Sequence, residues 1–263
     1  MTPDLHEPTA DNDDLKSRLE REAKFHDAKY SGADLYPKHY ALKPTEYVYN
    51  EMSRMLGDLT GKQVLEYGCG EGWITRDLAS RGAEVFAFDV SDQSIATTRG
   101  VLDKAGLLAR CHLQVMPAEA LSYADESFDV AVGFAIIHHL DLNKALAELH
   151  RVLRPGGVAY FAEPLGTNPA IEIYRRLTPQ FRTSDERPLV LSELPHLLRS
   201  FRAFSHEEHY LTALGAVALA YIPGGARVFP ALSAQLHRVD KTLLKQFPQL
   251  GRLAWYTVLR IQK

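Results

Sequence analysis

Hydrophobic and polar residues repeat with two different periods along the chain, and these periods predict its secondary structure. Short apolar segments typical of strands occur at residues 62–67, 84–88, 111–115, 128–134 and, after a turn at 154–157, 158–162. Segments with a helical period lie between them, at residues 45–56, 73–80, 91–106 and 143–153. Strands that alternate with helices at these lengths predict an α/β fold with a mostly parallel, doubly wound sheet.

The pattern changes after residue 163. Four prolines between residues 166 and 198 indicate short helices joined by loops, and residues 204–210 and 253–261 are predicted to be two further strands. Residues 211–250 are apolar and helix-compatible, with a break at 223–225. In their second half we expect an amphipathic helix with an apolar side made by Leu236, Val239, Leu243 and Phe247. At the other end of the chain, residues 15–29 are charged and helix-compatible.

Composition and charge narrow the functional classes. The 263 residues are 46% apolar and 24% charged, as in a globular protein. The net charge of −3 provides no general attraction to nucleic acid, so no nucleic-acid partner is expected. With two cysteines, a disulfide scaffold and a thiolate-rich metal site are excluded, and no other convincing ligand set predicts a metal. Residues 1–14 are polar and acidic and do not resemble a signal peptide, so we expect a cytoplasmic protein.

The segment from Val64 to Trp73 carries the most specific signal. An apolar strand runs into Gly68, Gly70 and Gly72, and a helical pattern follows. Such a loop brings bare backbone to a ligand at a helix N-terminus. The second strand ends at Asp89, where a carboxylate is suited to bind ribose hydroxyls. The dinucleotide motif G-x-G-x-x-G would need glycine at position 73, so Trp73 disfavours a nicotinamide-dependent oxidoreductase.

These residues carry a family resemblance. Four motifs occur in order: the segment 66–72 with its three glycines, Asp89, the block 118–130 (AEALSYADESFDV) and the later Leu153-Arg154-Pro155-Gly156-Gly157. Together they resemble the class I S-adenosylmethionine-dependent methyltransferases, and among these the small-molecule enzymes of the ubiquinone and menaquinone biosynthesis type. The resemblance covers roughly residues 60 to 165. It implies a Rossmann-like seven-stranded sheet whose last strand is antiparallel.

The resemblance also implies roles for individual residues around S-adenosylmethionine. Its methionine and ribose would be flanked by Gly68, Gly70 and Gly72, and its amino group would lie near Glu66, directly or through water. The ribose would be bound by Asp89. The adenine would pack on Val90, with Ala118 and Glu119 at its edge. The acidic position that family members often have before this alanine is Pro117 here, so Glu119 or a backbone carbonyl would replace it. Glu119 is equally compatible with a solvated loop.

Candidate catalytic residues follow the fourth and fifth strands. The backbone of Phe134 would line the reacting end of the cofactor, and His138 or His139 could act as a general base, with His138 preferred. In this family a histidine here is often structural instead. Glu163 lies at the carboxyl end of the fifth strand, where ligands bind in open α/β sheets. It is a candidate for substrate contact or proton acceptance.

The segment after Glu163 is predicted to select the acceptor. Tyr174, Arg175 and Arg182 are candidates for substrate binding, with an arginine holding a carboxylate or phosphate, although ion pairing inside the segment would also explain them. From residue 227 onward the chain has seven Lys or Arg and one acid, among them Arg238, Lys241 and Lys245. This basic C-terminal region is compatible with peripheral membrane contact, although a solvated basic face is the simpler interpretation.

We therefore predict three regions. Residues 1–60 would form helical lid elements, with the first ~14 residues disordered; residues 61–165 would form the cofactor-binding core, and residues 166–263 a helical cap plus the last two strands. In the resembled family the N-terminal segment closes over the cofactor, and Tyr30 is the residue we expect to shield the sulfonium, unless it simply packs the lid on the core.

The predicted reaction is methyl transfer from S-adenosylmethionine to a small or amphiphilic metabolite, with oxygen favoured over nitrogen and carbon. The alternatives are a cofactor-binding scaffold without methyl transfer and an NAD-dependent oxidoreductase.

Overall fold

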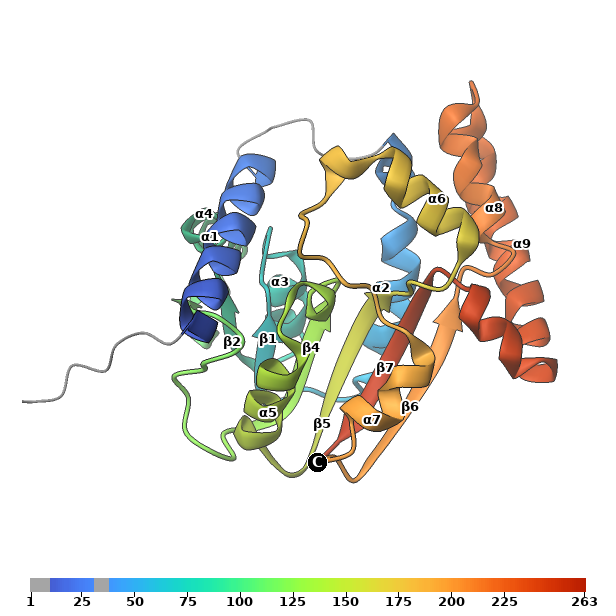
Figure 1. Cartoon of the computed structure of the whole chain (residues 1–263). Helices are drawn as coiled ribbons and strands as arrows, with labels where there is room; N and C mark the ends of the chain where they lie inside the picture. The colour runs from blue at the N-terminus through green and yellow to red at the C-terminus, as the bar shows by residue number, and fades with distance from the viewer. Residues whose placement is uncertain (1–9, 31–37) are drawn as a thin grey trace, which may run out of the picture.

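The computed structural model describes residues 10–30 and 38–263, and in the first helix it describes the side chains of residues 15–28 (Figure 1). The side chain of Tyr30 lies outside the described residues, so its predicted contact with the cofactor stays a prediction. The first helix, α1 (Ala10–Tyr30), begins five residues earlier than expected. Residues 10–14 are therefore helical and not disordered, and residues 1–9 lie outside the described part of the chain.

The strands form one seven-stranded sheet in the order β3-β2-β1-β4-β5-β7-β6. Their bounds are β1 Gln63–Tyr67, β2 Glu84–Asp89, β3 Cys111–Val115, β4 Phe128–Phe134, β5 Leu153–Pro164, β6 Ala203–His209 and β7 Tyr256–Gln262. β7 is antiparallel to both of its neighbours, and the pairs from β3 to β5 are parallel. The predicted fold class is confirmed. The turn expected at residues 154–157 lies within β5 as an irregularity: Leu153 pairs with Phe128, residues 154–157 have no partner in β4, and pairing resumes between Val158 and Val130.

Helices cover both faces of the sheet. They are α2 Pro44–Met55, α3 Trp73–Ser80, α4 Asp92–Ala105, α5 Leu142–Val152, α6 Pro169–Leu177, α7 Leu194–Leu197, α8 Leu214–Val217 and α9 Gly225–Gln246. Short 3-10 turns are η1 Lys38–Leu42, η2 Leu108–Arg110, η3 Ile137–His139, η4 Pro179–Phe181, η5 Leu191–Glu193, η6 Ala218–Tyr221 and η7 Pro248–Leu253. In the described part of the chain, no helix combines the length and the apolar character needed to cross a membrane.

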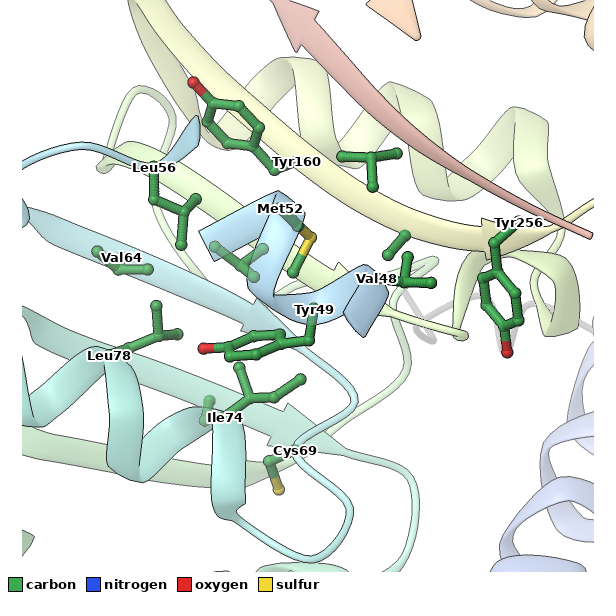
Figure 2. Close-up of a cluster of buried hydrophobic side chains, with 14 of the residues drawn as sticks. Val48, Tyr49, Met52, Leu56, Val64, Cys69, Ile74, Leu78, Tyr160 and Tyr256 are labelled. Atoms are coloured by element: carbon green, nitrogen blue, oxygen red, sulfur yellow. The ribbon is translucent and has the colours of Figure 1, made fainter. Parts of the chain in front are cut away.

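Strand periodicity divides the core into two layers. Along β5, Tyr160 and Ala162 face the layer built with α2, α3 and α4, whereas Ala159 and Phe161 face the layer built with α5 and α7. This alternation follows from the two-residue period of a strand. Figure 2 shows Val48, Tyr49 and Met52 of α2 among residues of β1, α3 and β5 in the first layer. These buried contacts hold the sheet and α2 as a firm base for the site.

The buried face of α9 differs from the prediction. Val239 and Phe247 are exposed, and the residues of α9 that are buried include Ser233, His237 and Asp240. Asp240 explains the difference, because its carboxylate accepts hydrogen bonds from the backbone N–H groups of residues 211, 212 and 213 at 2.7–3.2 Å. A buried carboxylate that caps a neighbouring turn determines the orientation of this helix more strongly than its apolar residues do.

Candidate active site

The site lies at the carboxyl ends of β1 and β4, where the strand order reverses. β1 is flanked by β2 on one side and by β4 on the other, and chain connections leave these two strands in opposite directions across the sheet. Above this edge, α1 lies on the β2 side and α6 on the β5 side (Figure 1). Loops from both halves of the sheet therefore meet in one crevice, which is where ligands bind in folds of this type.

The glycine loop after β1 needs glycine for two distinct reasons. Gly68, Gly70 and Gly72 all have positive φ angles, of 68°, 49° and 77°. A Cβ atom at Gly68 would lie 2.8 Å from Cδ1 of Ile136, and one at Gly72 would lie 2.8 Å from the Cα atom of Thr98. The left-handed backbone disfavours a side chain at all three positions, and at Gly72 the backbone of α4 leaves no room for one. The loop thus presents bare backbone at the start of α3.

Asp89 supports this loop from the end of β2. Its Oδ2 accepts a hydrogen bond from the N–H of Gly70, and its Oδ1 accepts one from the N–H of Ser91, each at 3.0 Å. Burial raises the pKa of Asp89, and the hydrogen bonds from Ser91 and Gly70 oppose that shift. Each oxygen keeps a further lone pair, so the residue can hold the loop and still accept hydrogen bonds from a diol.

Glu66 is a buried carboxylate directly before the loop. It is 1% exposed, and Thr75 of α3 offers it only weak hydrogen bonds. Burial, reinforced by the charge of Asp89 and partly opposed by Thr75, raises the pKa of Glu66 to about 8. A buried carboxylate beside a glycine cradle fits a ligand that carries an ammonium group. The residues present therefore fit the amino-acid end of S-adenosylmethionine.

The predicted adenine end lies beneath α1. Val90 is half-buried and Ala118 is buried. Glu119 is buried as well, where its carboxylate accepts hydrogen bonds from the guanidinium of Arg18 and, at 2.9 Å, from the N–H of Asp141. Asp27 of α1 accepts a hydrogen bond from the hydroxyl of Ser91. Glu119 is thus not a solvated loop acid. Its carboxylate joins α1 to the start of α5, so this group already has protein partners.

A cavity of about 470 Å³ opens between the glycine loop and the cap. One wall is aromatic: Trp73 packs edge-on against Tyr49 at 4.6 Å and against Phe134 at 6.0 Å between ring centroids. The opposite end is lined by further rings, namely His39, Tyr40, Tyr174, Tyr221, Trp255 and Tyr256. Gly68 and Gly70 line the cavity, whereas Asp89 and Glu119 do not. The cavity therefore joins the methyl-donor end of the predicted cofactor site to an aromatic chamber.

His138 and Glu163 form a buried pair at the floor of the cavity. Nδ1 of His138 lies 2.6 Å from Oε2 of Glu163, and Oε1 of Glu163 accepts hydrogen bonds from the N–H groups of Ile136 and Ile137. Glu163 has no exposed surface and does not line the cavity. Its oxygens hold the η3 turn and the imidazole of His138, so Glu163 is placed to act through His138, and the substrate contact or proton acceptance expected for it stays a prediction.

His139 turns toward the lid. Its Nδ1 lies 3.1 Å from Oε2 of Glu22 in α1, and its backbone carbonyl accepts a hydrogen bond from Arg18. Burial alone would raise the pKa of Glu22, but the imidazoles of His139 and His26 more than offset it, so its pKa lies below the usual range. Both predicted histidines line the cavity, and their Nδ1 atoms face different carboxylates.

The three predicted substrate residues also line the cavity. Arg175 pairs with Glu186 at 3.1 Å, and Arg182 lies 3.7 Å from the same carboxylate. The hydroxyl of Tyr174 is buried close to Thr178 and Tyr221. Arg175 also lies 3.6 Å from Glu172, so two carboxylates balance the charges of the two guanidinium groups. For Arg175 and Arg182 the sequence left open ion pairing within the cap and substrate binding, and in this position the two roles are compatible.

Several cavity residues were not singled out by their sequence pattern. His39, Trp255 and Tyr256 come from η1 and the start of β7, far apart in the chain. Glu22 and His26 are four residues apart on α1, a spacing that places both on one helix face. That spacing was available in the sequence, but their partner His139 lies more than 110 residues later, and no local pattern connects them.

Comparisons with known proteins agree with this geometry. Residues 65–161 match the family model described as a methyltransferase domain. The chain is 34% identical over 186 residues to the malonyl-[acyl-carrier protein] O-methyltransferase of Salmonella typhimurium, with 67% of each chain covered. It is 33% identical over 105 residues to a ubiquinone biosynthesis O-methyltransferase of Sinorhizobium medicae, covering 40% of this chain and 42% of the relative. The chain thus spans less than half of that relative's length.

A solved structure shows the same fold. Phosphoethanolamine N-methyltransferase 2 of Haemonchus contortus, in complex with phosphomonomethylethanolamine and S-adenosylhomocysteine, superimposes with a TM-score of 0.61 at 19% identity. The match covers 86% of this chain and 57% of that one. The fold, the enzyme class and the methyl donor predicted from the sequence are confirmed, and neither the scaffold nor the oxidoreductase alternative is favoured. The chain belongs to the class I S-adenosylmethionine-dependent methyltransferases.

Proposed function

We propose that this enzyme methylates an acidic oxygen of an amphiphilic small molecule, and that His138 removes the proton of that oxygen. The observation that carries the proposal is the His138–Glu163 pair at the cavity floor, 2.6 Å apart. O-methylation is also the reaction for which both curated relatives are named. The cytoplasmic location expected from the sequence stays a prediction.

The residues that fit the methyl donor divide its recognition among them. Glu66 would bind the amino group, Asp89 the ribose hydroxyls, and the loop from Gly68 to Gly72 the connecting atoms. When bound, S-adenosylmethionine supplies a methyl group on an already activated sulfonium. The protein then has to orient the acceptor oxygen in line, exclude water and take up one proton.

His138 is suited to that last task. The carboxylate of Glu163 accepts a hydrogen bond at Nδ1, which leaves Nε2 as the nitrogen with a free lone pair. Burial and the neighbouring His139 lower the pKa of His138, so the ring is neutral near pH 7. Nε2 would accept the proton of the acceptor O–H as that oxygen displaces S-adenosylhomocysteine from the donated methyl group, whose bonding electron pair to sulfur would stay on sulfur.

The cap supports an acceptor with both an aromatic or acyl part and an anionic group. The chamber is lined by aromatic rings, and Arg175 and Arg182 share Glu186 there. A carboxylate or other anion of the acceptor would pair with one of these guanidinium groups in exchange for a protein carboxylate. We assign Tyr174 to the same chamber, where its buried hydroxyl would hydrogen-bond the acceptor.

We propose peripheral membrane contact at the mouth of this cavity and not through the whole basic C-terminal region. Five exposed apolar residues lie on α6, at the end of η6 and on α9, and we call them the mouth patch: Ile173, Leu177, Tyr221, Ile222 and Val228. Tyr221 also lines the cavity. Arg176 and Arg227 are exposed nearby in sequence, and residues 211–239 contain no acid. Apolar side chains next to cations suit an anionic lipid surface.

The proposed chemistry is tested with His138→Gln and Glu163→Gln, assayed with labelled S-adenosylmethionine on a panel of alkyl-chain phenols and carboxylic acids. Loss of a general base should lower kcat on phenols by about 10²–10⁴-fold. Glu163→Gln should lower it less and shift the pH profile, because it changes the tautomer and basicity of His138. Affinity for S-adenosylhomocysteine should be unchanged in both. Full activity of folded His138→Gln on every accepted phenol would exclude the role of His138.

A further inference from the structure

Three potential ligand groups converge between the lid and the floor of the cavity. Glu22 and His26 come from α1, and His139 comes from η3. Oε2 of Glu22 lies 3.1 Å from Nδ1 of His139 and 3.6 Å from Nε2 of His26. The two imidazole rings are 5.6 Å apart between centroids and inclined by 72°. One atom from each of the three residues lies within 4.8 Å of the other two.

The carboxylate and one of the imidazoles are buried. Glu22 is 4% exposed and His139 is 8% exposed. Oε2 of Glu22 lies 3.1 Å from Nδ1 of His139, so a shared proton satisfies this pair when no ion is bound. A divalent cation would replace that proton and would also engage His26, which no single proton can do.

The spacing matches a metal of the zinc class. A tetrahedral Zn²⁺ with bonds of about 2.0–2.1 Å to nitrogen and oxygen separates its ligand atoms by about 3.3 Å. The separations of 3.1 and 3.6 Å bracket that value. Two imidazoles and one carboxylate form a donor set that Zn²⁺ and similar divalent ions prefer. We propose that Glu22, His26 and His139 bind a divalent transition metal ion, which fastens α1 over the cofactor end of the cavity.

The surroundings resemble the outer shell of a metal site. The hydroxyl of Thr183 donates a hydrogen bond to the other oxygen of Glu22, and Arg18 holds the backbone carbonyl of His139. Such partners orient metal ligands. His26 and His139 both line the cavity, so a fourth coordination position opens toward it. The ligands of the proposed metal do not include His138, the proposed base, although the rings of His138 and His139 lie 4.2 Å apart between centroids.

A neighbouring group of His138, His139 and Glu186 is a weaker candidate. Glu186 is paired with Arg175 and Arg182, and His138 is held by Glu163. Two guanidinium groups beside one carboxylate disfavour a further cation. The sequence predicted no metal because the adjacent histidines lacked other ligands; the fold supplies Glu22 and His26 from α1.

Metal binding is measured on the whole, tag-free chain after dialysis against a chelator. Titration with Zn²⁺, and with Co²⁺ as a spectroscopic probe, should show one equivalent bound, with the visible absorption of four- or five-coordinate cobalt. Glu22→Gln and His26→Asn each remove a proposed ligand, so each should weaken metal binding more than loss of a residue that only orients a ligand, which typically costs roughly 10–100-fold in metal affinity. Thr183→Ala should weaken it about 10-fold. His112→Asn, which removes a surface histidine paired with Glu84 at 2.6 Å, is the matched control and should bind normally.

Two further readouts separate a metal site from a purely polar latch. His26→Cys should retain the metal and add a thiolate-to-cobalt charge-transfer band, which a structural role alone would not produce. Hydrogen exchange in residues 15–28 should slow by at least about 10-fold on metal binding. Absence of stoichiometric binding, normal affinity in Glu22→Gln, or an unchanged exchange rate of α1 would each overturn the proposal. None of these measurements depends on an acceptor substrate or on methyl transfer.

Discussion

Asp89 is expected to serve cofactor binding in two ways at once. It accepts hydrogen bonds from the N–H groups of Gly70 and Ser91, and it keeps lone pairs that would accept hydrogen bonds from the predicted ribose. Asp89→Ala should weaken binding of S-adenosylhomocysteine by about 1–3 kcal/mol, because it removes charge-assisted hydrogen bonds and loosens the loop. Calorimetry measures this change, and Asp89→Asn should lose less. An unchanged affinity in folded Asp89→Ala would contradict the assigned role.

Glu66 leads to a prediction about protons. Burial raises its pKa to about 8, so the carboxyl is mostly protonated at pH 7 in the free protein. An ammonium group of the cofactor would favour the charged form, so its binding at pH 7 should release close to one proton. Calorimetry of S-adenosylmethionine binding in buffers of different ionisation enthalpy counts that proton. Glu66→Gln should abolish the release, and a wild-type protein that releases none would contradict the contact.

Residues that act through backbone geometry were predictable, and residues whose role depends on distant partners were not. The left-handed glycines and Asp89 follow from strand ends that the sequence marks locally. Glu163 also lies at a strand end, but its role depends on the N–H groups of the η3 turn, which only the folded chain brings within 3.0 Å. A position at the correct edge of the sheet does not reveal which way a carboxylate is turned.

At the scale of elements, the core helices and strands agree closely with the predicted ranges, while α9 shows where the pattern fails. α3, β3 and β4 have the predicted bounds. In α9 the predicted apolar residue Val239 is exposed, whereas Asp240 beside it is buried because its carboxylate accepts three backbone hydrogen bonds. Hydrophobic periodicity is reliable where burial dominates, as in β4, and unreliable where one buried polar group does.

The mouth patch makes a prediction that belongs to α6 and η6. If it contacts a membrane, the double variant Leu177→Ser with Ile222→Ser should reduce binding to anionic vesicles on the order of 10-fold, since each side chain contributes part of its transfer free energy. Val239→Ser removes an exposed apolar residue farther along α9 and should bind like the wild type. Flotation with vesicles of mixed neutral and anionic lipid measures the difference. Absence of wild-type binding at low salt would exclude the contact.

At the scale of the molecule, polar contacts join the lid to both the core and the cap. α1 pairs with Glu119 and His139 of the core through Arg18 and Glu22, and Arg21 pairs with Asp185 of the cap at 2.9 Å. α1 has a low apolar content, so these contacts replace a packed interface. A helix held in this way can separate from the core without exposing a large apolar surface. Cofactor exchange beneath it is therefore compatible with an otherwise rigid sheet.

Buried neutral histidines should make the stability of the whole fold sensitive to mild acid. Burial lowers the pKa of His39, His209 and His237 from 6.5 to about 4. Below pH 6.5 the unfolded chain takes up protons at these residues while the native protein does not, so their contribution to stability falls as the pH drops from 6.5 toward 4. The contribution of His206 to stability changes with pH in the opposite direction, because Glu208 raises its pKa. The contribution of Glu66 also increases as the pH falls, because its pKa is raised in the folded protein.

Because groups of both signs titrate in this range, the test compares variants with the wild type. Urea unfolding at pH 7, 6 and 5 gives the free energy of unfolding for the wild type, His209→Gln and His237→Gln. Between pH 7 and 5 the free energy of unfolding of each variant should fall less than that of the wild type, by up to about 2 kcal/mol. This value follows from linkage, because pH 5 lies about 1.5 units below the ordinary histidine pKa of about 6.5. His196→Gln, at an exposed position on α7, should follow the wild-type curve. If the free energy of unfolding depended on pH in the same way in all four proteins, the buried histidines would be protonated in the native state. The predicted acid sensitivity requires them to be neutral there.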